Sequence, residues 1–357
     1  MMSAVSSVRA VPETTDMHGD DLSADDAWHT VRHAGLLALG RTAFLRFRYG
    51  DGFSHARAFA LQLALATVPL IIAGSGLASA IGVESVAQVV ARTVVAVSPG
   101  TGDQLLADVV DRAAAPAPAP TVEPGDDEAE TPDRPGEDLG ELAVVFGLVT
   151  AFVAMTSAFA QLERGANRVY GVERDRPALR KYARAAVLTA TAGVALGVGL
   201  VLIVAGGPFG AALEQVYRWG DAAETLWDVV RWPVGLAALV VAVTTLFRFA
   251  PRRRQPGLSW LALGAAFTVV AWLAASGAIS AYVSVSGEFS ATYGPLAGIM
   301  VLLLWAFVTG VALLAGFAVS AQLEAVRAGV VDPLLVDEDD DGVPDHRQSA
   351  EQHAAGG

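Results

Sequence analysis

Residues 161–184, QLERGANRVYGVERDRPALRKYAR, decide how this chain is arranged, because they place many basic side chains between two apolar segments. The flanking apolar segments are 142–162 and 185–206. The basic residues of the stretch are Arg164, Arg168, Arg174, Arg176, Arg180, Lys181 and Arg184. Arg and Lys are retained on the cytoplasmic side of a bacterial membrane, so such a loop predicts the orientation of both flanking spans.

The composition indicates a membrane protein. Of the 357 residues, 53% are hydrophobic and 17% are charged, whereas a soluble chain carries roughly 25% charged residues. The apolar residues form uninterrupted blocks near the roughly 20 residues that a helix needs to cross a bilayer. We therefore predict an all-α polytopic fold with six transmembrane helices, at 58–82, 142–162, 185–206, 231–249, 258–281 and 295–319.

Basic residues are distributed unequally between the two sides of these spans. One side receives the stretch 161–184 and the residues Arg41, Arg46, Arg48, Arg57, Arg248, Arg252, Arg253, Arg254 and Arg327. The other side receives only Arg92, Arg112, Arg134, Arg218 and Arg231. We therefore expect a bacterial plasma (inner) membrane protein with both its N and C termini in the cytoplasm.

The segments outside the spans are polar and acidic. We predict disordered tails at 1–22 and 329–357, and a Pro-rich acidic extracytoplasmic insert at 115–138. The membrane domain occupies 23–328. The net charge of −13 is concentrated in these acidic segments, and nucleic acid is not an expected partner because phosphates repel carboxylates.

Residues 23–48 show an amphipathic helical pattern, with Ser23 or Asp25 as its N-terminal cap. The apolar positions at helical spacing are Trp28, Val31, Leu36, Leu39 and Ala43. We interpret the pattern as one interfacial helix on the cytoplasmic surface of the membrane. The alternative is a helix that packs on the protein itself.

The sequence contains no recognisable catalytic constellation. Its six His residues lie outside the expected spans, it has no Cys, and it lacks the common metalloprotease, hydrolase and phosphate-loop motifs. We therefore expect no enzyme, no catalytic residue and no cofactor. The central parts of the spans carry no ionisable residue, but Gln62 needs a hydrogen-bond partner there and Pro69 is expected to kink its helix.

Several motifs together resemble the YihY/BrkB family of bacterial inner-membrane proteins. In the segment Gly165–Pro177, the residues that carry the family's loop motif are Asn167, Tyr170, Gly171 and Pro177. His55–Pro69 resembles the family's first span, Phe247–Pro251 its fourth-to-fifth junction, and Tyr293, Gly294 and Trp305 the start of its sixth span. The segment Gly316–Ser320 departs from the family, because it lacks the Glu and Asn of the usual Gly-Ala-Glu-Leu-Asn motif.

The resemblance implies six helices, cytoplasmic termini and a poorly defined role in envelope integrity. We hypothesise that the protein transports or flips a lipid or amphipathic solute; a non-transporting scaffold for envelope assembly is the alternative. Membrane lipids and envelope proteins are the expected partners, and the oligomeric state is not predicted. The basic residues of 161–184 would gain about 1 kcal/mol per contact with anionic head groups, although cytoplasmic retention explains the same charges.

The C-terminal tail contains part of a calcium-binding pattern, DxDxDGxxxD, with Asp337, Asp339, Asp341 and Asp345 at the ligand spacing. Gln348 stands where an EF-hand has its bidentate Glu, so we favour a solvated acidic tail. A peptide covering 332–352 is expected to give no binding heat in isothermal titration with millimolar calcium. Measurable saturable heat would assign a metal site to the tail.

Overall fold

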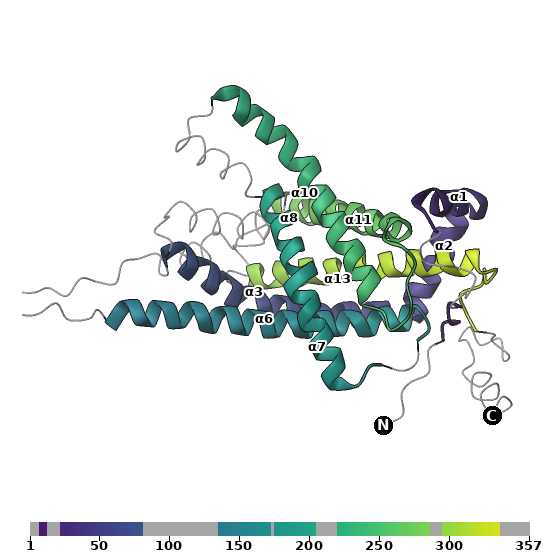
Figure 1. Ribbon diagram of the computed structural model, residues 1–357, viewed down its shortest axis with the longest axis horizontal. Coiled ribbons are helices and arrows are strands. Elements are labelled where there is room, and N and C mark those ends of the chain that lie inside the picture. The colour runs from purple at the N-terminus through teal and green to yellow at the C-terminus, as the bar shows by residue number, and fades with distance from the viewer. Residues whose placement is uncertain are drawn as a thin grey trace, which may run out of the picture.

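The computed structural model describes residues 7–12, 22–80, 135–172, 175–204, 220–285 and 295–335, so most of the expected insert 115–138 lies outside it. The helices, shown in Figure 1, are α1 (Ala24–Ala34), α2 (Leu36–Tyr49), α3 (Gly52–Ala80), α6 (Pro135–Val169), α7 (Ala178–Leu188), the π-helical turn η1 (Thr189–Gly193), α8 (Val194–Val204), α10 (Asp221–Phe249), α11 (Leu258–Val285) and α13 (Pro295–Arg327). Within the described ranges the only extended pairing is an isolated bridge between Val8 and Leu334. The all-α prediction is confirmed.

Among the described residues, five helical segments are long and apolar enough to cross a membrane. They are Val144–Val169, Ala178–Leu200, Thr225–Phe249, Leu258–Val283 and Ala297–Arg327. In each segment, at most 39% of the most apolar stretch is buried inside the protein. Most of the apolar side chains therefore face outward, as in lipid-facing helices. These five segments match five of the six expected spans, and the first, at 58–82, is not among them.

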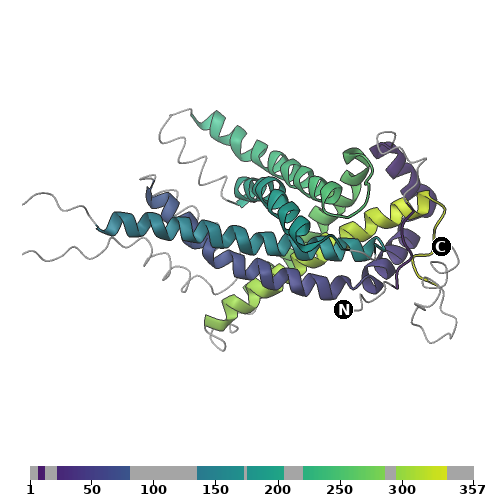
Figure 2. The same ribbon diagram turned by 60° about the horizontal axis from the view of Figure 1, so that its bottom comes forward.

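The helices form a bundle in which α3 and α6 lie side by side along much of their length (Figure 2). The helix α13 packs on α3 and α6, and α11 packs on α13. The helix α10 packs on both α11 and α8. The short helices α1 and α2 cover one end of this bundle, where α1 contacts α11 and α13 and α2 contacts α13 (Figure 1).

The N-terminal amphipathic pattern forms two helices rather than one. Ser23 and Asp26 make a capping box, in which the Ser23 hydroxyl accepts from the Asp26 N–H at 3.3 Å and the Asp26 carboxylate accepts from the Ser23 N–H at 3.0 Å. Gly35 then separates α1 from α2 with φ of +78°, a conformation that is costly for residues with a Cβ. The helix α1 contacts α11 and α13. These contacts favour the alternative interpretation, a helix that packs on the protein itself.

The basic stretch 161–184 is largely helical and not one loop. The helix α6 continues to Val169, α7 begins at Ala178, and only residues 170–177 connect them. Gly171, two residues after the end of α6, has φ of +73° and turns the chain away from the helix. The π-helical turn η1 interrupts the third expected span, and such turns often occur at functional positions.

Parts of both expected tails are ordered. Residues 7–12, which we call the strap, pair with the segment that follows α13: the Arg9 N–H donates to Pro333 O at 2.8 Å, and the Leu335 N–H donates to Ser7 O at 3.2 Å. Val8 and Val11 are 3% and 5% exposed. The expectation of disorder over 1–22 and 329–357 is therefore wrong for the strap and for residues 329–335, because apolar burial and backbone pairing stabilise them.

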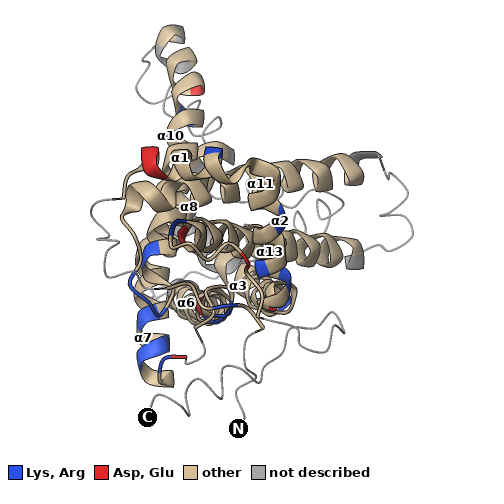
Figure 3. Ribbon diagram, turned by 90° about the vertical axis from the view of Figure 1, so that its right-hand side faces the viewer, with Lys and Arg blue, Asp and Glu red and all other residues tan. Residues whose placement is uncertain are grey.

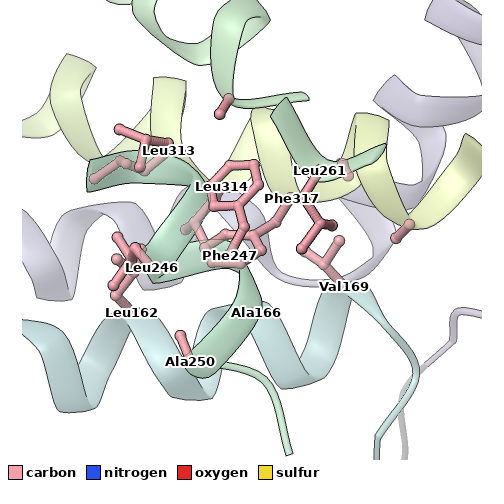
Figure 4. Close-up of a cluster of buried hydrophobic side chains, with 14 of the residues drawn as sticks. Leu162, Ala166, Val169, Leu246, Phe247, Ala250, Leu261, Leu313, Leu314 and Phe317 are labelled. Atoms are coloured by element: carbon pink, nitrogen blue, oxygen red, sulfur yellow. The ribbon is translucent and has the colours of Figure 1, made fainter. Parts of the chain in front are cut away.

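A cluster of buried apolar side chains lies where the end of α10 meets α6 and α13 (Figure 4). Phe247 of α10 stacks on Phe317 of α13, with ring centroids 4.1 Å apart. Leu162 and Val169 of α6 and Leu314 of α13 are fully buried around them. Lipid tails are as apolar as leucine, so close van der Waals packing stabilises such a contact more than exclusion of water does.

Glycines allow α11 and α13 to approach closely. A Cβ on Gly264 would overlap the Ser320 hydroxyl, and a Cβ on Gly316 would overlap the Thr268 hydroxyl. The carbonyl oxygen of Gly264 lies only 3.1 Å from the position of a Cβ on Gly316. Small residues allow helix backbones to approach in this way in membranes, so these two glycines set the separation of α11 and α13.

Replacing Gly264 by Ala is expected to lower the free energy of unfolding by about 1–3 kcal/mol, because the added methyl group has no free space. Gly277→Ala on the same helix is the matched control, since nothing lies within 4 Å of its Cβ position, and it should be neutral or stabilising by up to about 1 kcal/mol. Thermal unfolding in one detergent measures both. Equal effects would contradict close approach at Gly264.

Candidate functional site: a buried arginine cluster

Charged and polar side chains gather at the end of the bundle that α1 and α2 cover. We call them the arginine cluster, and its members are Arg46, Tyr170, Arg253, Gln322 and Glu324. Arg46 lies on α2, Tyr170 directly follows α6, Arg253 lies between α10 and α11, and the other two lie on α13. All five side chains are at least nine-tenths buried, and buried charges are stable only when they are paired.

Glu324 is held through both of its carboxylate oxygens. Its Oε1 accepts from the Tyr170 hydroxyl at 3.0 Å, and its Oε2 lies 2.9 Å from Nη1 of Arg253. The Arg253 guanidinium also stacks on the Tyr170 ring, with Cζ 4.8 Å from the ring centroid, which adds a cation–π attraction. These three residues therefore join the end of α6, the α10–α11 loop and α13.

Within the described residues, the side chain of Arg46 donates its hydrogen bonds to neutral acceptors. Its Nε donates to Gln322 Oε1 at 2.9 Å. Its Nη1 donates to the carbonyl oxygens of Val169, at 3.2 Å, and of Arg9 in the strap, at 3.0 Å. Gln322 in turn donates to the carbonyl oxygen of Val331 at 2.8 Å. Arg46 thus connects α2 to α6, α13 and the strap.

The cluster carries a net positive charge at neutral pH when Glu324 is ionised. Burial lowers the pKa of Arg46 to about 10, which still leaves the guanidinium charged at pH 7. Burial also raises the pKa of the Tyr170 hydroxyl well above its ordinary value, so this hydroxyl remains a hydrogen-bond donor. Two guanidinium groups therefore face one carboxylate.

The strap covers the cluster. The Val11 N–H donates to Tyr170 O at 3.1 Å, and Arg253 Nη2 donates to Pro12 O at 3.4 Å. The Cα of Ala10 lies 2.5 Å from where a Cβ of Gly171 would stand. Gly171 is thus required both by its positive φ and by the backbone that passes over it.

A second polar group, beside the first, fastens the α10–α11 loop to α6. We call it the loop clasp, and it consists of Glu163, Asn167 and Arg176. Arg176 Nη1 lies 2.6 Å from Glu163 Oε1 and donates to Ala250 O at 2.9 Å. The Asn167 side-chain oxygen accepts from the Arg252 N–H at 2.7 Å. The clasp satisfies loop backbone groups that would otherwise lack partners.

The basic residues of 161–184 differ in how far they are buried. Arg176 belongs to the loop clasp, Lys181 is only 5% exposed, and Arg184 donates to Phe249 O at 2.7 Å. The remaining members are Arg164 and Arg180, which are exposed, Arg168, which is half-buried, and Arg174, which lies outside the described residues. Figure 3, which views this end, shows Lys and Arg on α7 and beside α2 and α13. Contact with anionic head groups stays a prediction.

The described residues of the family loop motif lie in or next to these two groups. Asn167 belongs to the clasp, Tyr170 to the cluster, and Gly171 lies beneath the strap. Pro177 precedes α7, and its carbonyl oxygen accepts from the Lys181 N–H at 3.0 Å. The motif therefore marks the connection between α6 and α7 as the place where distant segments of the chain meet.

The other candidate residues lie elsewhere. Gln62 and Pro69 are half-buried on α3. Trp305 of α13 donates to Ser276 Oγ of α11 at 3.2 Å, and Trp272 of α11 donates to Thr309 Oγ1 of α13 at 3.1 Å, so Trp305 belongs to a reciprocal interhelical pair. Outside the described residues lie Tyr293, Gly294, Asp337, Asp339, Asp341 and Asp345.

Sequence reasoning missed most of the arginine cluster. It treated Arg46 and Arg253 only as markers of the cytoplasmic side, and it did not single out Glu324. The polar residues that continue α13 beyond the expected end of the sixth span at 319 were the available signal. Their partners could not be inferred, because Arg46 and Gln322 are 276 residues apart in the chain.

The arrangement is suited to holding anionic oxygen atoms. Guanidinium groups and a phenol supply directional donors for carboxylate or phosphate oxygens. In the part of the chain that the structure describes, no three His, Cys, Asp or Glu side chains gather to hold a metal ion.

A family model described as Virulence factor BrkB matches residues 43–334. The chain belongs to the BrkB family. This confirms the resemblance that the loop motif indicated. The matched segment contains every member of the arginine cluster and of the loop clasp, whereas the strap lies before it.

Two curated relatives are similar over about half of the chain. The putative ribonuclease-like protein YfkH of Bacillus subtilis (strain 168) is 28% identical over 178 residues, covering 50% of this chain and 64% of the relative. The UPF0761 membrane protein Bxeno_A3061 of Paraburkholderia xenovorans (strain LB400) is 25% identical over 191 residues, covering 51% of this chain and 41% of the relative. The chain thus spans less than two thirds of each relative's length, and no solved structure matches it.

Replacing Arg253 by Gln is expected to lower the free energy of unfolding by about 3–5 kcal/mol, because Glu324 would remain buried without its countercharge. Arg164→Gln is the control: its pair with Asp175 joins side chains that are 44% and 38% exposed, and such pairs contribute about 0–1 kcal/mol. Denaturant titration of both purified variants in the same detergent measures the difference. Similar losses would contradict a buried Glu324–Arg253 pair.

Proposed function

We propose that this BrkB-family protein crosses the bacterial plasma membrane six times, with both termini in the cytoplasm. The helix α3 is the crossing that we add to the five candidate spans. The pairing of the strap with residues 333–335 supports this topology. Two chain ends on the same side require an even number of crossings, and α3 adds one to the five candidate spans. The basic residues at that end support its placement in the cytoplasm.

We further propose that the protein contributes to envelope integrity by moving a lipid or another amphipathic solute between the two leaflets. The observation that carries this proposal is the division of the helices into two groups. One group consists of α8 and α10, and the other of α3, α6 and α13, with α11 packed on both α10 and α13. The two groups are joined near the arginine cluster and diverge away from it (Figures 1 and 2).

The α8–α10 pair is closely packed within itself. A Cβ on Gly199 of α8 would lie 3.4 Å from the carbonyl oxygen of Gly235 on α10, and one on Gly235 would lie 2.6 Å from Ile203. Within the described residues, the extensive packing of α8 is with α10 and with the adjoining η1. Outside the pair, α10 packs on α11, which in turn packs on α13, so the pair is connected to the other group through α11 and η1. A pair that is closely packed within itself is suited to move as one body.

The joint between the two groups contains the π-helical turn. The Thr156 hydroxyl of α6 donates to the Thr189 hydroxyl of η1 at 3.4 Å. Phe159 lies 3.2 Å from the position of a Cβ on Gly193. A π turn breaks the regular hydrogen-bond pattern of a helix and permits bending there. We infer that the α8–α10 pair moves relative to α6 at this joint.

The chemistry of the spans favours an amphipathic solute over an ion. The central parts of the expected spans have no Asp, Glu, Lys, Arg or His, although such residues usually line ion and proton pathways. The faces of α6 and α8 carry exposed apolar side chains, including Phe146, Val153 and Val198. These features fit contact with acyl chains, and membrane lipids are the partners we propose.

A non-transporting scaffold for envelope assembly is the alternative. The observation that favours it is the tight connection of α2, α6, the α10–α11 loop, α13 and the strap through the arginine cluster, which would present a rigid surface to envelope proteins. Neither proposal is enzymatic, because the sequence offers no catalytic constellation. The words "ribonuclease-like" belong to the name of YfkH and carry no activity over to this chain.

Purified protein in liposomes is expected to accelerate the transfer of a fluorescent anionic lipid between leaflets, measured by dithionite quenching. Empty liposomes and liposomes with an unrelated membrane protein of similar size are the controls. Transfer no faster than in empty liposomes would overturn the transport proposal and favour the scaffold.

The joint itself can be tested with cysteines, because the natural chain contains none. The double variant Thr156→Cys/Thr189→Cys replaces two hydroxyls 3.4 Å apart, and its oxidation should lock α6 to η1 and stop lipid transfer until a reductant is added. The two single variants are the matched controls and should respond to neither treatment. Undiminished transfer by the oxidised, cross-linked variant would contradict movement at this joint.

A further inference from the structure

The arginine cluster has more positive charge and more donor capacity than its protein partners satisfy. Arg253 pairs with the one carboxylate of the cluster, that of Glu324, whereas the hydrogen bonds of Arg46 within the described residues go to neutral acceptors. Nη2 of Arg46 is buried and has no hydrogen-bond partner, and the Arg46 side chain is fully buried. A buried, unsatisfied guanidinium donor is costly, so the site lacks an acceptor that would complete it.

The strap occupies the place of such an acceptor. Its carbonyl oxygens at Arg9 and Pro12 accept from Arg46 Nη1, at 3.0 Å, and from Arg253 Nη2, at 3.4 Å. These oxygens are neutral, whereas guanidinium groups bind anionic oxygens about twice as strongly. The two carbonyl groups are three residues apart in the chain, so one short segment supplies weak acceptors to both arginines.

The strap is also attached by contacts that the arginines do not make. Val8 and Val11 are its buried apolar side chains, and its backbone bonds reach residues 333–335 and Tyr170. It also lies outside the segment that matches the BrkB family, 43–334, whereas both arginines lie inside that segment. The arginine cluster therefore lies in the part of the chain that matches the family, and the strap lies in a part that does not.

We propose that the arginine cluster is a binding site for a phosphate group, and that the strap closes this site by placing its carbonyl oxygens where phosphate oxygens would bind. Phosphate fits better than carboxylate because two guanidinium groups on different elements can each reach separate oxygens of a tetrahedral anion. The phosphate comes from a lipid head group or from a soluble phosphate. The site does not depend on lipid transfer and could serve the scaffold equally.

The first test compares the full chain with a chain that lacks residues 1–12, both purified in detergent and titrated calorimetrically with inorganic phosphate. Removal of the strap should tighten phosphate binding at least tenfold. In the shortened chain, Arg46→Gln should abolish this binding and Arg46→Lys should weaken it, because lysine keeps the charge but loses the planar fork. Arg180→Gln, at an exposed position on α7, is the matched control and should bind as the shortened parent does.

A second test distinguishes the source of the phosphate. The shortened chain is titrated with inorganic phosphate in nanodiscs of phosphatidylcholine alone, or of phosphatidylcholine with phosphatidic acid. Weaker phosphate binding in the acidic nanodiscs would assign the site to a lipid head group, and unchanged binding would assign it to soluble phosphate. No phosphate binding in detergent or in either nanodisc would overturn the proposal.

Folding is verified by thermal unfolding of each variant. If the shortened chain does not fold, the full-length variant Val8→Ser/Val11→Ser replaces it, because it removes the strap's buried apolar anchors, adds no charge beside the arginines and leaves every cluster residue in place. This variant should bind inorganic phosphate at least tenfold more tightly than the natural chain. A folded variant with unchanged weak binding would contradict a site beneath the strap.

Discussion

The burial of Glu324 is the constraint on which this end of the molecule depends. A carboxylate that is 1% exposed is stable only with a countercharge and a donor nearby, and no single segment supplies both. Arg253 comes from the α10–α11 loop and the Tyr170 hydroxyl from the end of α6. Placing Glu324 at this position of α13 therefore requires three distant parts of the chain to meet.

This requirement shapes the neighbouring connections. The α10–α11 loop must be held against α6, and the loop clasp does so through Arg176 and Asn167. The end of α10 must then lie between α6 and α13, where Phe247 stacks on Phe317. In the membrane the helices are freer, because lipid offers apolar side chains nearly the same environment as a neighbouring helix does. The result is a bundle that is tightly joined at one end and divided into two groups further along.

Several local features of this arrangement could be predicted. The apolar blocks indicated the helices, Ser23 proved to be the cap of α1, and the motif around Asn167, Tyr170 and Gly171 indicated the family. The interruption at Gly35 was not predicted, because apolar spacing alone does not reveal a glycine with a positive φ. The order of the strap was missed for a similar reason: residues 7–12 have no helical or strand period, and they are stabilised by contacts with distant segments, at Tyr170, at 333–335 and at the two arginines of the cluster.

The sequence by itself determined that this is an all-helical membrane protein of the BrkB family, since span length and family motifs are properties of contiguous residues. Only the tertiary structure decided which of the many arginines are buried. Arg180 and Arg253 are alike in sequence terms, yet one is exposed on α7 and the other pairs with Glu324. The physical reason is that the stability of a buried charge depends on partners brought from distant segments, and no local pattern records them.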